Sequence, residues 1–243
     1  MNVTTHLAAS GPVIPNFSTH SSSCAVHNRV FCWDWLKANW GTVLWPALRQ
    51  HVILTLIAVS IGFAIAMALA LYAHRHRWAE RPVLLFTTFL YTIPSLALFE
   101  LLVAPVGPNV FAAEIALVSY TLLILFRNIV TGLRSVPAEV LEAAEGMGMT
   151  SRQALLRVEL PLALPAIVAG LRIAVVTIIA LATIVYTIYD RGLGVPIHQA
   201  LGEGPFKTEL LAAGGMAILL ALVADGLLVG AQRLLTPWAR MRA

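Results

Sequence analysis

Residues 142–161 read EAAEGMGMTSRQALLRVELP, a charged, helix-forming segment between long apolar runs. The triplet at 142–144 favours a short helix, because Glu and Ala are good helix formers. Gly148 permits a sharp turn after that helix. Pro161 suits the first turn of a helix, where its missing N–H costs no hydrogen bond. The segment is therefore predicted to be a short helix, a turn and the beginning of a second helix.

The composition places the chain in a bilayer. Of its 243 residues, 59% are hydrophobic and 12% are charged, with a mean hydropathy of +0.82. Soluble domains carry roughly 25% charged residues. The net charge is +4, but the basic residues gather in particular loops and not in a nucleic-acid-binding patch. We therefore expect a membrane protein without a nucleic-acid partner.

Five apolar segments are long enough to cross a membrane, which takes about 20 residues. They are 52–72, 82–106, 110–126, 162–188 and 210–234, and the second is interrupted by Pro94. Residues 33–50 are shorter, amphipathic and rich in Trp, a residue suited to the membrane interface. The expected organisation is a polar tail over 1–35, an interfacial helix over 36–50, a transmembrane domain over 51–235 and a tail over 236–243.

The loop charges predict the orientation. The three basic regions hold Arg75, Arg77 and Arg81; Arg127, Arg134, Arg152 and Arg157; and Arg233, Arg240 and Arg242. The turn at 104–109 has no basic residue, and 190–207 has two basic and two acidic ones. The positive-inside rule places the basic regions in the cytoplasm. The N-terminus is then outside, the C-terminus inside, and 142–161 in the cytoplasm.

The chain has no motif for binding ATP or for catalysis. It has no G-x-x-x-x-G-K-[ST] phosphate loop, so a different chain must bind any ATP that is used. It also lacks HExxH and GxSxG, which argues against an intramembrane protease or lipase. We predict no catalytic residue, and no cofactor in this chain.

The first 35 residues lack the apolar core of a signal peptide and are expected to remain as an extracytoplasmic tail. Cys24 and Cys32 both fall in this tail, where they form either a disulfide or two free thiols. His6, His20 and His27 have no metal-site spacing, so no metal ligand is predicted.

The 142–161 segment resembles the coupling loop of membrane subunits of ATP-binding-cassette (ABC) importers, with the pattern EAA-x3-G-x9-[IV]-x-LP. The matching positions are Glu142, Ala143, Ala144, Gly148, Val158, Leu160 and Pro161. Residues 92–99, TIPSLALF, resemble a segment of permeases for osmoprotectants such as glycine betaine, choline, carnitine and proline. Residues 192–194, Gly-Leu-Gly, resemble the outer glycine turn of that family.

This resemblance, over about 52–234, implies an all-α fold, the type I ABC importer transmembrane domain, with its coupling loop at 136–161. It implies a multi-pass protein of a bacterial cell membrane. It also implies two ABC ATPase subunits that bind ATP and Mg, a second permease subunit and an extracytoplasmic substrate-binding protein. Small residues in the loop would let the ATPase approach its backbone closely.

One segment departs from the family pattern. Small residues usually precede the outer glycine turn, but here 186–191 read YTIYDR, a bulkier and charged lip near the expected outer mouth. The alternatives to an osmoprotectant permease are an import permease for another small solute, such as an amino acid or sulfonate, and a membrane scaffold without transport.

Charges inside the spans require partners, because burying them in lipid is costly. Arg172 and Asp225 are expected at similar depth and are predicted to form an intramembrane ion pair, with a structural role or with a contact to substrate. Glu100 and Glu114 fall toward the outer ends of their spans, where they are either solvated or functional.

A quaternary ammonium substrate would be attracted to aromatic faces by cation–π interactions. The candidates for a transient pathway are Tyr91, Phe99, Tyr120, Tyr186 and Tyr189, with bundle packing as the alternative for each. Pro94 either breaks its span beside the pathway or is a tolerated kink.

Overall fold

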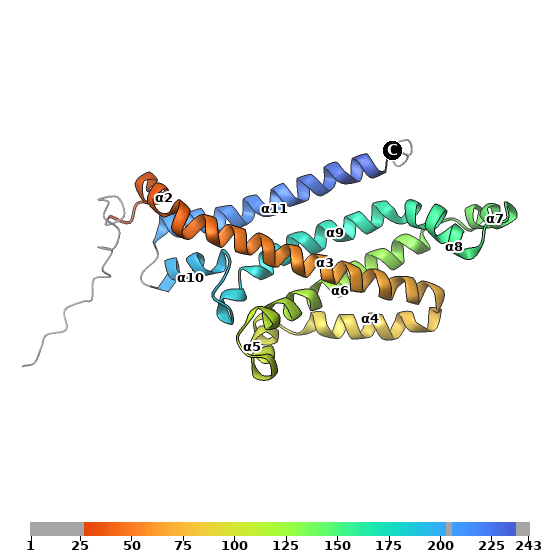
Figure 1. Cartoon of the computed structure of the whole chain (residues 1–243), viewed down its shortest axis with the longest axis horizontal. Helices are drawn as coiled ribbons and strands as arrows, with labels where there is room; N and C mark the ends of the chain where they lie inside the picture. The colour runs from red at the N-terminus through yellow and green to blue at the C-terminus, as the bar shows by residue number, and fades with distance from the viewer. Residues whose placement is uncertain (1–26, 203–205, 237–243) are drawn as a thin grey trace, which may run out of the picture.

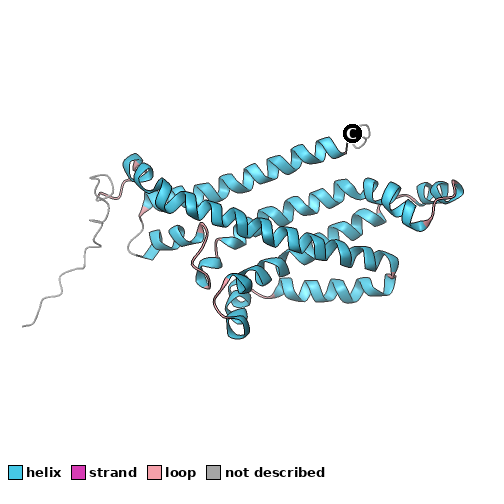
Figure 2. Cartoon of the chain, in the orientation of Figure 1, coloured by secondary structure: helices cyan, strands magenta, loops and turns pink. Residues whose placement is uncertain are grey.

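A computed structural model describes residues 27–202 and 206–236. Within these ranges the regular structure is entirely helical (Figure 2). Most of the polar tail, including His6, His20 and Cys24, lies outside the described residues, as does the end of the chain from 237 on. The choice between a Cys24–Cys32 disulfide and two free thiols is therefore left open, and the cytoplasmic location of Arg240 and Arg242 stays a prediction.

The helices follow one another closely along the chain. In order they are α2 (Trp33–Asn39), a π-helical turn (Trp40–Leu44), α3 (Trp45–Arg75), α4 (Arg77–Thr92), α5 (Ser95–Val106), α6 (Val110–Arg134), α7 (Ala138–Gly146), α8 (Ser151–Ala154), a second π-helical turn (Leu155–Glu159), α9 (Leu160–Ala182), a 3₁₀ turn (Val185–Thr187), α10 (Gly194–Gly202) and α11 (Lys207–Leu235).

Helices α3, α6 and α9 form the centre of the bundle, with α4 and α5 on one side and α11 on the other (Figure 1). Two buried apolar clusters run along this centre, one around Phe99 and Leu117 and one around Phe126 and Ile129. The α7–α8 segment lies at one end of the bundle, called here the coupling end. Helices α2 and α10 lie at the opposite end, the lip end (Figure 1).

A close approach between α3 and α6 depends on Gly62. A Cβ atom at this position would lie 1.8 Å from Oγ1 of Thr121, so no larger residue fits without moving α6. Small residues are common at helix interfaces in membranes, where tight packing of the backbones replaces the hydrophobic driving force between helices. Gly62 thus sets the spacing of the two central helices.

Four helices of the described chain are long and apolar enough to cross a membrane, or five if a bent pair counts as one span. That pair is α4 and α5, which meet at an angle of 97° around Ile93 and Pro94. The expected single span over 82–106 is therefore two helices. Proline disfavours helical geometry in the residue before it, and Ile93 has an extended ψ of 127°.

The expected boundary between an interfacial helix over 36–50 and a first span at 51 does not coincide with a helix end. Residues 45–50 are the first turns of α3, and the helical path from Trp33 to Arg75 is continuous. The beginning of this path packs against other residues of the lip end. Trp35 is buried against Phe206, with ring centroids 5.2 Å apart. Trp33, Trp40 and Trp45 are exposed, as expected for residues in the membrane interface.

Candidate functional site

Helix α7 presents the predicted coupling triplet at the coupling end. Pro137 precedes the helix with extended backbone, and Ala144 is buried while Glu142 and Ala143 are exposed. One face of α7 is thus fixed to the protein and the other is open to a partner. Glu139 and Glu145 are exposed as well, so α7 carries a small acidic surface.

Gly148 is required by the backbone conformation and not by lack of space. Its φ is +80°, a region that L side chains rarely adopt, while no atom lies within 4 Å of a Cβ built there. The amide of Gly148 donates to the carbonyl of Glu145 at 2.8 Å, and the amide of Met149 donates to that of Ala144 at 3.1 Å. These bonds end α7 and turn the chain back toward the bundle.

The next helix begins earlier than the sequence predicts. Thr150 caps α8 in a reciprocal arrangement with Gln153, so the helix starts at Ser151 and not near Pro161. Leu155–Glu159 is a π-helical turn, and α9 follows it without a break. Proline cannot donate an i→i−4 hydrogen bond, and the wider turn directly before Pro161 lets the helix pass through it. Leu160 and Pro161 thus lie within one continuous helical path.

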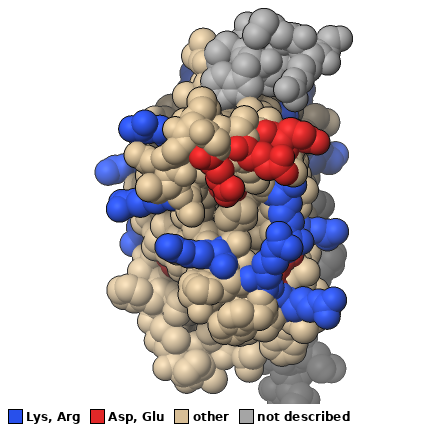
Figure 3. Space-filling view, turned by 90° about the vertical axis from the view of Figure 1, so that its right-hand side faces the viewer, with Lys and Arg blue, Asp and Glu red and all other residues tan. Residues whose placement is uncertain are grey.

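Two side-chain contacts lie near the coupling end, one between α3 and the π-helical turn and one between α6 and α4. His74 Nε2, at the end of α3, lies 2.6 Å from Oε2 of the buried Glu159 in the π-helical turn. Arg134, at the end of α6, pairs with Glu80 of α4. Figure 3 looks onto this end and shows acidic side chains gathered in one area with basic side chains around them.

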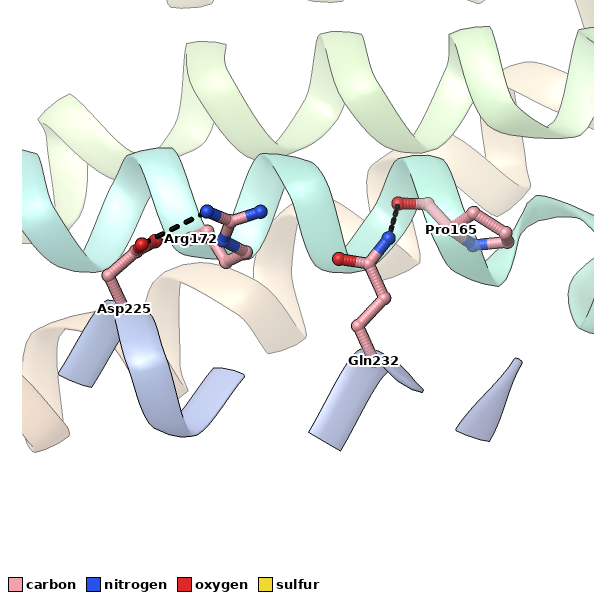
Figure 4. Close-up of polar contacts among 4 residues, drawn as sticks. All are labelled: Pro165, Arg172, Asp225 and Gln232. Carbon is pink, nitrogen blue, oxygen red and sulfur yellow. Dashed lines mark hydrogen bonds and ion pairs between the residues drawn. The ribbon is translucent and has the colours of Figure 1, made fainter. Parts of the chain in front are cut away.

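Arg172 and Asp225 form the ion pair that their positions suggested. The guanidinium donates from Nε to Oδ1 at 2.8 Å and from its terminal nitrogen to Oδ2 at 3.0 Å (Figure 4). Two turns toward the coupling end, Gln232 donates to the carbonyl of Pro165 at 3.4 Å. The two contacts fasten α11 to α9. A hollow of about 390 Å³ lies beside the ion pair and is lined mainly by α9.

The aromatic candidates from spans two and three gather at the α4–α5 break. Tyr120 donates its hydroxyl hydrogen to the carbonyl of Ile93, and its ring meets that of Tyr91 edge to face, with centroids 5.7 Å apart. Tyr120 and Phe99 are buried in the core, whereas Tyr91 is 41% exposed. Phe99 and Tyr120 thus pack in the bundle core, and Tyr91 is the exposed ring beside Pro94.

Tyr186 and Tyr189 belong to the lip at 186–191, and Tyr189 packs against the core cluster that contains Phe99 and Tyr120. The Tyr186 ring stacks on His198 of α10 at 4.3 Å between centroids. The Arg191 guanidinium lies 5.8 Å from the centre of the Tyr189 ring. Both contacts lie within the lip end, so the bulky residues of YTIYDR are held by neighbours there.

The two outer glutamates differ from each other. Glu100 is exposed on the surface of the described chain. Both carboxylate oxygens of Glu114 are buried and have no hydrogen-bond partner among the described residues. Across those same residues, no three His, Cys, Asp or Glu side chains are grouped so that they could hold a metal ion.

The sequence reasoning missed His51, which precedes the first predicted span. Its side chain is fully buried and contacts both α9 and the glycine turn at 192–194. The available signal was a polar pair, Gln50 and His51, at the start of an otherwise uncharged apolar run. Their partners are more than 120 positions away in the chain, so local patterns could not identify them.

Comparison with known proteins gives matches to one family model and to several transport permeases. Residues 43–240 match the family model described as "Binding-protein-dependent transport system inner membrane component". The choline transport system permease protein OpuBB of Bacillus subtilis is 33% identical over 210 residues, which cover 86% of this chain and 95% of that protein. The osmoprotectant import permease protein OsmW of Salmonella typhimurium is 39% identical over 193 residues, or 77% of this chain and 89% of that protein.

A solved structure shows the same fold. A chain of the MetNI methionine ABC transporter, in an inward-facing conformation, superimposes with a TM-score of 0.71 over 80% of this chain and 96% of its own length. The two sequences are 20% identical, so this likeness concerns the architecture alone.

Proposed function

Because the chain belongs to the family of binding-protein-dependent transport system inner membrane components, we propose that it is the permease subunit of an ATP-driven importer for osmoprotectants. The observation that carries the proposal is the coupling segment. It combines an exposed helix, α7, with a glycine turn and a helical path that leads directly into the bundle. A membrane protein without transport would have no need for such a connection.

The proposed cargo is a small quaternary amine or a related solute, such as glycine betaine, choline, carnitine or proline. Two relatives are named for choline and for osmoprotectants, and each matches most of its own length to this chain. Tyr91 offers an exposed aromatic face at the α4–α5 break, where a cation can be attracted on its way through the membrane.

The proposed complex contains two ATPase subunits, a second permease subunit and a substrate-binding protein outside the membrane. ATP and Mg are bound by the ATPases, since the chain itself has no phosphate loop. The basic loops support an orientation with the N-terminus outside and the C-terminus inside, so that α7 faces the ATPases in the cytoplasm.

ATP binding can drive transport only by favouring one conformation of the complex over another. In this chain, a displacement of α7 reaches α8 through the glycine turn. From Ser151 on it is transmitted through the π-helical turn into α9, because the helical path from there is unbroken. The Arg172–Asp225 ion pair and the Gln232–Pro165 contact then make α11 move together with α9.

The proposal is tested by reconstituting the chain with its ATPase and binding protein in vesicles. We expect ATP-dependent uptake of radiolabelled glycine betaine, choline, carnitine or proline, and none without the ATPase. Uptake of an amino acid such as methionine or of a sulfonate, with none of the four osmoprotectants, would contradict the proposed cargo. Failure of the chain to bind any ATPase would contradict the whole proposal.

A further inference from the structure

His51 connects three parts of the chain near the lip end. It lies in α3, its Nε2 is 3.0 Å from the carbonyl oxygen of Ile179 in α9, and its Nδ1 is 3.3 Å from the amide nitrogen of Leu193. The neighbouring Gln50 accepts a hydrogen bond from the amide of Gly192 at 3.2 Å. Two consecutive residues of α3 therefore hold two consecutive amides of the glycine turn.

The partners of His51 determine where its hydrogen lies. A backbone amide can only donate, so Nδ1 must be the unprotonated acceptor for Leu193. A backbone carbonyl can only accept, so Nε2 must carry the hydrogen that it donates to Ile179. The ring is thus neutral, and its donor and its acceptor are both used. A hydrocarbon side chain of similar size would fill the space and make neither bond.

The glycine turn fits tightly between its neighbours. Gly192 has a φ of +84°, and a Cβ there would lie 3.2 Å from Nδ1 of His51. A Cβ on Gly194 would lie 2.0 Å from the carbonyl oxygen of Thr183, at the end of α9. The side chain of Leu193 is fully buried together with Ala47 of α3 and Ala217 of α11. The turn is therefore a junction of α3, α9 and α11.

The lip at 186–191 ends directly at this junction. On its other side the lip follows the end of α9, and Val185 and Ile188 pack into the core around Phe99. The position of the lip relative to α3 thus depends on the turn that His51 and Gln50 hold. Both hydrogen bonds come from backbone amides and are therefore independent of the lip's side chains.

We propose that His51 is a positioning residue for transport. Through Nδ1 it holds the glycine turn 192–194, and with it the lip 186–191, in place against α3. The bond from Nε2 to Ile179 orients the ring so that Nδ1 faces the turn. The attachment itself is a property of this chain, and its importance for transport rests on the proposed function.

Two amide side chains separate the contributions of the ring nitrogens. In His51→Asn the amide oxygen lies near the position of Nδ1 and can accept from Leu193. In His51→Gln the amide lies near the position of Nε2 and can bond Ile179 only. His51→Leu makes neither bond. Thr55→Val is the matched control, because Thr55 is buried one turn further along α3 and donates to the backbone carbonyl of His51, a bond within the helix that does not involve the ring.

The first measurement is hydrogen exchange of the peptide covering 186–196, by mass spectrometry of the complete permease complex. We expect slow exchange in the wild type, His51→Asn and Thr55→Val. Exchange in His51→Gln and His51→Leu should be faster by about fivefold or more, as expected for loss of one buried hydrogen bond. Equal exchange in all variants, or protection by Gln and not by Asn, would overturn the proposed attachment.

The second measurement is ATP-dependent uptake of radiolabelled glycine betaine and choline into vesicles. The wild type, His51→Asn and Thr55→Val should transport normally. His51→Gln and His51→Leu should show reduced uptake, although the same amount of protein is recovered. Faster exchange of the lip with unchanged uptake would overturn the role in transport. Absence of uptake in the wild type as well would refute the proposed cargo, and the exchange order would still decide the attachment.

Discussion

Single residues of this chain act through specific contacts that only partly follow from their positions in the sequence. Arg172 and Asp225 could be paired in advance, because two opposite charges inside apolar spans have few other ways to be satisfied. His51 could not, since nothing near it in the chain indicates a bond to Leu193. For Phe99 and Tyr120 the sequence left a pathway and bundle packing as alternatives, because ring type alone does not distinguish the two, and in the structure both rings are buried.

Removing one partner of the ion pair should destabilise the protein more than removing both. In Asp225→Ala the guanidinium of Arg172 loses its bidentate partner while it remains between two helices. We expect a lower melting temperature and less recovered complex. The double variant Arg172→Ala/Asp225→Ala should recover part of the loss. Thermal unfolding in detergent measures both, and a double variant no more stable than Asp225→Ala would contradict a structural ion pair.

Gly148 and Gly146 form a matched pair for testing the turn after α7. Gly148→Ala should strain the turn by about 1–2 kcal/mol, because the φ of +80° is unfavourable for alanine. Gly146→Ala lies at the end of α7 with free space around it and should be neutral or slightly stabilising. Hydrogen exchange of 145–151 and binding of the ATPase are the measurements. Equal effects of the two changes would show that the turn geometry is unimportant.

At the scale of elements, the apolar segments predicted the long helices well and their ends poorly. A run of apolar residues shows that a span exists, but the capping of Thr150 and the bend at Pro94 decide where helices begin and end. The π-helical turn at Leu155–Glu159 could not be predicted, since it results from how Pro161 is accommodated in a helix whose two ends are both held. It lies in the connection between α7 and the bundle, where a change of register alters the direction of α7.

Pro161→Ala should change this register without damaging the bundle. The new N–H allows a regular α-helical turn of 3.6 residues in place of the wider π-helical turn, and this shifts the register of the residues before it relative to α9. We expect α7 to be rotated relative to α9, with reduced ATP-driven uptake at normal protein recovery. Pro165→Ala, one turn further inside α9, is the control for loss of a proline alone. Unchanged uptake in Pro161→Ala would show that the wider turn has no role in coupling.

At the scale of the whole molecule, the coupling end carries both basic and acidic side chains. Basic residues surround the coupling end, and the acidic surface of α7 stands among them (Figure 3). The basic residues were sufficient to predict an orientation, and the motif was sufficient to predict the coupling segment. The predicted Arg172–Asp225 pair indicated one contact between α9 and α11. That α9 would also provide most of the packing of α11 depends on contacts between distant parts of the chain and could not be predicted.

The acidic surface of α7 should contribute to binding of the ATPase in a salt-dependent way. Changing Glu139, Glu142 and Glu145 together to Gln should weaken ATPase binding by about threefold to 150-fold at low salt, since each exposed ion pair contributes roughly 0.2–1 kcal/mol. The change should also flatten the salt dependence. Glu100→Gln, an exposed glutamate outside α7, is the control. Binding that is equally strong and equally salt-sensitive in both variants would contradict this role.

Helix α3 is long enough to extend from the lipid of the bilayer to the water at its surface. Its 31 residues extend over about 46 Å at 1.5 Å per residue, which matches the full thickness of a bilayer with its headgroups. The cluster of Trp35 and Phe206 therefore lies at or beyond one membrane surface. Water favours burial of these rings, whereas lipid provides no such driving force for the helices below. Urea should therefore loosen the cluster at a concentration that leaves the bundle intact. A harsh detergent should disrupt the packing of the bundle helices before it loosens the cluster.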